Sequence, residues 1–325
     1  MIKQGNVYTK RSRTYLMGVA IILVVMTHVV TQEVSHPIHT LFSLFFKEGH
    51  CGVNIFFILS TYGLCFSYNH HSLTDFYKKR IMRIWPMYPA ACIARHLIRW
   101  DGDFLNFIAS SISDITGIFL FQRTTDFFWY MGVLTILYLL FPLIYKLCDL
   151  TSKYKMHVLL LTCALVWIGT SFDYGNNQIY LHTLTRIPCM YLGFFTFLCE
   201  KEKNYDMAYL GYGFCALLSL TPIFPMAFLF LPAAIFLIAR SSILPFERVV
   251  SFLGRHSLEI YLGHTFAVYH ILSFPFSNPI NLMLFFTLSA TYSTLLYLIQ
   301  NIFTKRIYPN LNLRILCQKL KNLSD

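Results

Sequence analysis

His28 ends a run of apolar residues that begins at Tyr15. The run is apolar on every side, which is typical of a helix in lipid rather than of a helix on a soluble core. At a rise of 1.5 Å per residue, His28 lies roughly 20 Å above the start of this helix. A titratable ring at that depth is costly and therefore a functional candidate, since a neutral imidazole can remove a proton from an attacking hydroxyl. The alternative is a helix-end histidine that meets the membrane interface.

A second segment, residues 49–63, opens with two close glycines and carries Asn54 and Ser60. Glycine lets a backbone approach a ligand or another helix, and helix packing alone explains most glycines in membrane helices. We select Asn54 and Ser60 as candidate catalytic groups with His28. Either side chain could orient the imidazole or hold a developing oxyanion.

Basic residues dominate a third segment, residues 76–88. Arg80 and Arg83 are three residues apart and therefore neighbours on a helix that leads to Pro86. Paired guanidinium groups suit a phosphate-bearing ligand, so we predict that Arg80, Arg83 and the adjacent Lys79 bind one that arrives from the cytoplasm. The alternative is a set of ordinary cytoplasmic anchors before a membrane helix.

Three further ionisable residues fall at or inside predicted membrane helices. Arg186 precedes Pro188 at the start of a helix, where it either reaches the outer interface or lines a polar cavity. Glu259 and His264 enter the membrane from the cytoplasmic side, and an intramembrane carboxylate is a functional lead by default. We predict that all three contact substrate.

The composition requires an all-helical, polytopic membrane protein to position these groups. The chain has 325 residues, of which 56% are hydrophobic and only 13% charged, with a mean hydropathy of +0.54. A soluble protein has about 25% charged residues. The length allows about ten spans and no second globular domain. We place the spans near residues 14–31, 51–68, 84–98, 128–145, 156–172, 181–198, 207–222, 224–239, 257–274 and 281–303.

The basic residues set the predicted orientation. The net charge is +11, and most of the 26 Lys and Arg residues fall on the side that holds the N-terminus. This asymmetry follows the positive-inside rule, so we predict two cytoplasmic termini and find no support for a nucleic-acid partner. Residues 1–304 then form one transmembrane domain and residues 305–325 a short basic tail. The expected location is the bacterial inner (plasma) membrane.

Two other features complete this description. Residues 104–121 are apolar, but counting them as a span would place the later basic loops outside, so we predict a helix on or dipping into the outer surface. The nine cysteines form no C-x-x-C pair, so neither a disulfide framework nor a metal site is expected. No small-residue cleavage site follows the first apolar run, which we expect to be a retained span.

Read in order, these segments resemble the acyltransferase 3 family of integral membrane acyltransferases over residues 13–264. The first span is similar to that family's arginine followed by a catalytic histidine. "GHCGVNIFFILSTYG" resembles its G-V-acid-hydrophobic-F-F-x-L-S-G segment, and "FYKKRIMRIWPMY" its F-x-x-R-R-x-x-R-I-x-P segment. "WYMGVLTILYLLFP", "RIP" and "LGRHSLEIYLGH" are similar to its later motifs.

The resemblance implies a ten-helix fold and transfer of an acyl group, usually acetyl from acetyl-CoA, to a carbohydrate hydroxyl. It implies that His28 is the essential histidine, that Arg80 and Arg83 lie where the CoA phosphates bind, and that Arg186 is the R-I-P arginine. The expected partners are a glycan acceptor, lipid-linked or nascent, together with membrane lipids and other glycan-synthesis proteins.

Three positions depart from the family pattern. Met17 replaces the arginine before the histidine, Asn54 replaces the acid of the second span, and Leu134 replaces a frequent acid of the fourth. Arg13 lies one turn before Met17 on the same helix face, so we predict that it substitutes for the missing arginine in binding the donor.

Two other functional classes fit the same composition. A polysaccharide transporter or flippase would also be polytopic and basic inside, with buried arginines that contact phosphate. A non-catalytic subunit of a glycan-synthesis complex is the third class. Loss of acetylation in a His28→Ala variant at unchanged glycan yield would favour the acyltransferase over both.

Overall fold

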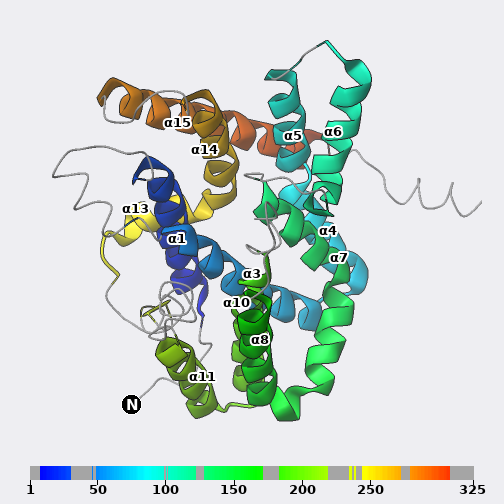
Figure 1. Ribbon diagram of the computed structural model, residues 1–325, viewed down its shortest axis with the longest axis vertical. Coiled ribbons are helices and arrows are strands. Elements are labelled where there is room, and N and C mark those ends of the chain that lie inside the picture. The colour runs from blue at the N-terminus through cyan, green and yellow to red at the C-terminus, as the bar shows by residue number, and fades with distance from the viewer. Residues whose placement is uncertain are drawn as a thin grey trace, which may run out of the picture.

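The structure is a computed structural model, and it describes residues 8–30, 46, 49–98, 100, 102–121, 128–170, 183–218, 234–235, 238, 244–271 and 279–307. Every regular element in these ranges is a helix, and no strand occurs among them (Figure 1). The predicted all-helical class is therefore confirmed for the described part of the chain.

The helices follow the apolar runs of the sequence. The elements are α1 (Lys10–Val30), η1 (Gly49–Cys51), α3 (Gly52–His70), α4 (Leu73–Ile84), α5 (Met87–Ile98), α6 (Phe104–Thr116), η2 (Ile118–Phe121), α7 (Trp129–Leu150), η3 (Ser152–Tyr154), α8 (Lys155–Thr170), α10 (Ile187–Lys201), α11 (Tyr205–Leu218), α13 (Glu247–Arg255), α14 (Ser257–Ile271), α15 (Pro279–Ile302) and η4 (Phe303–Ile307).

Four helices of the described ranges are long and apolar enough to cross a membrane: Lys10–Val29, Gly49–His70, Trp129–Leu150 and Ile280–Arg306. The other predicted spans coincide with shorter helices, except that residues 224–239 lie largely outside the description, as does most of the predicted tail. The helices support a membrane protein. Ten spans and two cytoplasmic ends stay predictions.

Helix α3 lies in the middle of the bundle, where it contacts α1, α7 and α10 (Figure 1). Gly193 allows the close approach of α10. A Cβ atom at Gly193 would lie 2.5 Å from the carbonyl oxygen of Ile58 and 2.8 Å from the Cβ of Thr61. Because real Cβ atoms do not come that close, this crossing requires a glycine.

Helices α1 and α13 cross through a pair of glycines. A Cβ atom at Gly18 would overlap the carbonyl oxygen of Val250, and one at Gly254 would overlap that of Thr14. The backbones of the two helices therefore touch directly. Since α14 begins two residues after α13 ends, this crossing also orients α14 relative to α1.

An ion pair holds the other end of α13 against α1. The Nε and Nη2 atoms of Arg11 donate to the two carboxylate oxygens of Glu247, each at 2.5 Å. This guanidinium holds the pKa of Glu247 below its ordinary value. Solvent weakens an exposed ion pair, but the bidentate geometry gives this contact a defined orientation.

Helices α5 and α6 pack together around a buried carboxylate. Asp114 Oδ2 lies 3.2 Å from Arg95 Nη2 and 2.8 Å from His96 Nε2. The opposite face of α6 is apolar and open, with Leu105 78% exposed. The predicted surface helix over 104–121 is thus an amphipathic helix over Phe104–Thr116, which ends at the left-handed Gly117 before η2, and its position at the outer membrane surface stays a prediction.

Candidate active site

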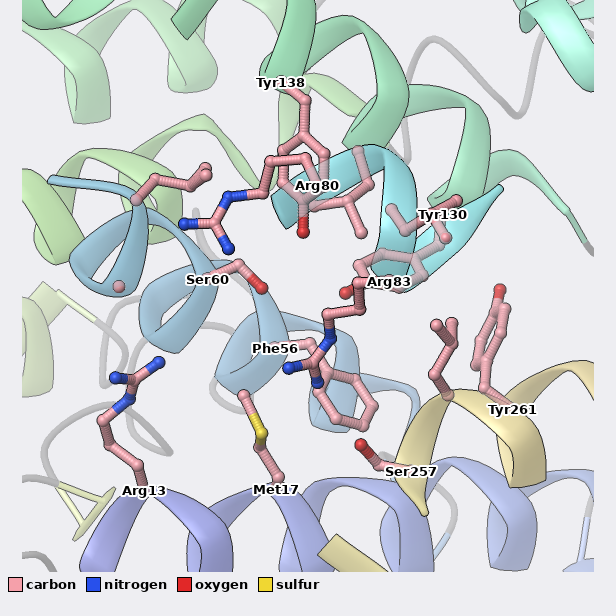
Figure 2. Close-up of a pocket in the computed structure, with 15 residues that line it drawn as sticks. Arg13, Met17, Phe56, Ser60, Arg80, Arg83, Tyr130, Tyr138, Ser257 and Tyr261 are labelled. Atoms are coloured by element: carbon pink, nitrogen blue, oxygen red, sulfur yellow. The ribbon is translucent and has the colours of Figure 1, made fainter. Parts of the chain in front are cut away.

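One cavity of the described chain gathers three arginines from two helices (Figure 2). Arg13 comes from α1, and Arg80 and Arg83 come from α4. We call this space the basic cavity. Its other lining residues are Met17, Phe56, Ser60, Gly63, Leu64, Ile84, Tyr130, Leu134, Tyr138, Ser257, Leu258 and Tyr261. No carboxylate is among them, so the cavity has a net positive charge that suits an anion.

Local packing explains why Arg13 turns inward. Its guanidinium lies against Gly63 of α3, where a Cβ atom would come within 2.5 Å of Nη2. The guanidinium carbon also lies 5.9 Å from the centre of the Tyr62 ring. Glycine leaves room for the charged group, and the ring face provides an attractive contact for it.

Two aromatic rings flank Arg80 in a similar way. Its guanidinium carbon lies 5.2 Å from the Phe76 ring centre and 5.8 Å from the Tyr138 ring centre. Burial, and to a smaller extent the charge of Arg83, lower the pKa of Arg80 from its ordinary value. Guanidinium groups stay protonated in proteins, so these like charges remain close together and favour a bound anion.

Farther along α1, His28 of this helix lies close to His264 of α14. The ring centres of His28 and His264 are 5.3 Å apart, and their planes are inclined by 35°. His264 is fully buried, and its Nδ1 is 3.0 Å from the carbonyl oxygen of Ile260. Because a carbonyl only accepts hydrogen bonds, Nδ1 is the protonated nitrogen of the neutral ring, and Nε2 carries the lone pair.

Two helices connect the basic cavity with the histidine pair. Arg13 and His28 are fifteen residues apart on α1, about 22 Å at the helical rise. On α14, Ser257 and Tyr261 line the cavity, and His264 follows on the same face at the i, i+4, i+7 spacing. The Tyr261 ring centre lies 5.5 Å from that of His264. Helices α1 and α14 therefore run from the basic cavity, which holds the guanidinium groups, to the pair of imidazoles.

A family model described as an acyltransferase domain matches residues 14–300, which include nearly all of this site. The chain belongs to the acyltransferase 3 family. This confirms the resemblance seen in the sequence motifs and identifies acyl transfer as the chemistry of the family. The comparisons with curated proteins and with solved structures found no match.

Two positions that depart from the family pattern share the basic cavity of this acyltransferase. Met17 and Leu134 both line it, from α1 and α7 respectively. An expected arginine and an expected acid are thus both replaced by apolar side chains around one space. Arg13, one turn before Met17, lines the same cavity, and its role in binding the donor stays a prediction.

The glycines of residues 49–63 allow a close approach to another helix, which in the structure is α1. A Cβ atom at Gly52 would overlap the carbonyl oxygen of Ala20, and one at Gly49 would overlap that of Leu23. Asn54 follows in α3 and is fully buried. Ser60 lies farther along α3, in the basic cavity beside the arginines rather than at the histidine pair.

The structure places Lys79 outside the basic cavity that Arg13 and Arg80 line. Lys79 Nζ contacts His71 Nε2 and lines a different, open hollow with Asp75 and Gln300. Arg83 reaches both spaces. A helix turns by about 100° per residue, so the residue directly before Arg80 points to another face.

Arg186 lies in the protein interior and not at an interface. It is 1% exposed, its Nη1 donates to Thr185 Oγ1 at 2.7 Å, and its guanidinium carbon lies 5.3 Å from the Trp129 ring centre. Trp129 begins α7, the helix that also lines the basic cavity. Of the two alternatives, the structure thus excludes an arginine that extends to the interface.

Glu259 is separated from His264 although both belong to α14. It lines an apolar groove beside α1 and α15, with its Oε1 3.9 Å from His256 Nδ1. Sequence analysis did not select the hydroxyl groups of Tyr130, Tyr138, Ser257 and Tyr261, which line the basic cavity. Their signal was the spacing along each helix: Ser257 and Tyr261 are four residues apart on α14, and Tyr130 and Tyr138 are two four-residue steps apart on α7, which puts each pair on one side of its helix.

Proposed function

We propose that this membrane protein transfers an acetyl or other short acyl group from acyl-CoA to a hydroxyl of a cell-surface or lipid-linked glycan. The basic cavity is the observation that carries this proposal. Arg13, Arg80 and Arg83 surround a space without a lining carboxylate, which favours a ligand with several negative charges. The phosphates of CoA have that character, and acyl-CoA, commonly acetyl-CoA, is a natural donor for an acyltransferase.

His28 is the proposed general base. The glycan hydroxyl oxygen bonds to the thioester carbonyl carbon while its proton moves to His28, and the carbon–sulfur bond then breaks. The proton passes from His28 to the departing sulfur, which gives an ester and free CoA. Ser60 and Asn54 are the proposed polar groups along the path of the donor, both in α3. This chemistry requires no metal.

The acceptor side of the proposal uses groups away from the basic cavity. Arg186, buried at the start of α10, would contact an anionic part of a lipid-linked glycan. Glu259 lies in an apolar groove of α1, α14 and α15, where its carboxylate could accept a hydrogen bond from a sugar hydroxyl. A multi-pass protein of the bacterial inner membrane would meet both substrates, with other glycan-synthesis proteins supplying the acceptor.

The decisive experiment measures the acetyl content of the host glycan by NMR in wild-type, deletion and His28→Ala strains matched for membrane expression. The proposal expects the acetyl signals to disappear in both mutants while the glycan yield is unchanged. Unchanged acetylation with a lower yield would instead favour a transporter. Unchanged acetylation and yield in His28, Arg80 and Arg83 variants would favour a non-catalytic subunit.

A further inference from the structure

His264 has an unusual hydrogen-bonding state for a buried histidine. Its side chain is fully buried, its Nδ1–H donates a hydrogen bond to the Ile260 carbonyl oxygen, and its Nε2 has no hydrogen-bond partner in the structure. A buried acceptor without a partner costs free energy, about 1–3 kcal/mol in typical proteins. Such an atom is rare in native proteins, and a catalytic role is one of the reasons for which it is retained.

The neighbouring ring on α1 is that of His28, which gains a proton during the proposed reaction. His28 lies 5.3 Å from His264, ring centre to ring centre. A neutral imidazole has one N–H group, whereas an imidazolium has two and needs a second acceptor. His264 Nε2 is an acceptor beside it, and the bond to Ile260 fixes the tautomer that keeps its lone pair available.

Packing on both sides fixes the position of His264. The Tyr261 ring contacts it edge-on, with planes inclined by 66°. The preceding residue, Gly263, brings α14 so close to α15 that a Cβ atom would lie 2.7 Å from the backbone nitrogen of Ser293. A ring held in this way can receive a proton donor without a rearrangement of the helices.

We propose that His264 is a positioning residue for His28. When His28 takes the proton of the glycan hydroxyl, its second N–H donates to His264 Nε2, and this bond stabilises the imidazolium. The bond is released when the proton moves on to the CoA sulfur. His264 thus orients His28 and accepts its second N–H as a carboxylate does in other catalytic pairs, but without the negative charge. This inference rests on the proposed acyl transfer.

The test compares two kinds of substitution at His264 in the full-length protein. His264→Leu and His264→Met remove the acceptor at similar volume, whereas His264→Gln keeps an acceptor near the position of Nε2. His157→Leu on α8 is the control for loss of a histidine, because His157 is exposed and lies on a helix that carries neither member of the pair. Membrane vesicles with endogenous acceptor receive radiolabelled acetyl-CoA, and initial rates give the maximal rate and the KM.

We expect the Leu and Met variants to lose about 100-fold in maximal rate, the range of one acid–base contribution, with an unchanged KM for acetyl-CoA. The Gln variant should recover most of the rate, and the control should match wild type. Wild-type rates in the Leu or Met variant, equal losses in the Leu and Gln variants, or a parallel rise in KM would overturn the inference. Gel filtration in detergent monitors folding, and the Leu–Met pair provides a second variant if one misfolds.

Failure of the underlying proposal gives a different pattern. In that case wild-type vesicles transfer no acetyl group from acetyl-CoA, or the His28→Ala variant transfers it at the wild-type rate. If wild type is active, His28→Ala is inactive and His264→Leu is active, only the role of His264 is wrong.

Discussion

At the scale of single residues, the arginines of the basic cavity have a measurable signature. Arg80→Ala or Arg83→Ala should raise the KM for acetyl-CoA by roughly 10- to 100-fold, because a hydrogen bond to a charged group contributes about 1.5–3 kcal/mol. The maximal rate should change much less, since neither group lies at the histidine pair. Initial-rate measurements with labelled acetyl-CoA in membrane vesicles check both values.

Lys79→Ala is the matched control for these variants, because Lys79 is adjacent in sequence but lines a separate hollow. Its KM should equal that of wild type. If Lys79→Ala and Arg80→Ala raised the KM equally, the basic cavity would not be the donor site, and a diffuse attraction of CoA to the cytoplasmic surface would explain the result.

Met17 and Leu134 provide a second prediction at this scale, because both line the basic cavity. Met17→Arg alone adds a fourth positive charge and should lower the melting temperature in detergent. Combined with Leu134→Glu, the new charges attract each other, so the double variant should be more stable than the sum of the single effects. A coupling of about 0.5–3 kcal/mol is expected for neighbouring groups. Strictly additive effects would mean that the two side chains do not meet across the cavity.

At the scale of elements, the crossing of α1 and α13 depends on the absence of a side chain. Gly18→Ala places a methyl group on the Val250 carbonyl and forces the two backbones apart. We expect a loss of about 1–3 kcal/mol in unfolding free energy, the typical cost of overpacking. Thermal unfolding in detergent measures it.

Gly213→Ala on α11 is the corresponding control, since a Cβ atom there would meet nothing within 4 Å. Alanine is the better helix former, so this variant should be as stable as wild type or slightly more stable. Equal destabilisation of the two variants would show that the close crossing is not the reason for the loss in Gly18→Ala.

The elements also show which parts of the site are predictable from sequence. The apolar runs predict α1, α3 and α7 well, because a lipid environment requires continuous apolar helices. The i, i+3 spacing of Arg80 and Arg83 predicts a shared face, and both line the basic cavity. The contact between His28 and His264 was not predictable, because it depends on how α14 packs against α1.

At the scale of the whole molecule, the orientation in the membrane remains a prediction that two fusions can test. Green fluorescent protein fused after Asp325 should fluoresce, because both termini are predicted to be cytoplasmic. Alkaline phosphatase fused after Gly102, in the loop between α5 and α6, should be active, because this loop is predicted to lie outside. An inactive fusion after Gly102 together with a non-fluorescent C-terminal fusion would show that the orientation is the reverse of the predicted one.

Helix α1 carries Arg13 at the basic cavity and His28 at the histidine pair, and this has a consequence for the choice of donor. A helix does not stretch, so the rise between these two residues, about 22 Å along α1, is fixed. A thioester that lacks the nucleotide part of CoA would have the reactive bond but no phosphates to bind the arginines. Nothing would then place its thioester group at the imidazoles. The protein would then select its donor by length before it selects it by acyl group.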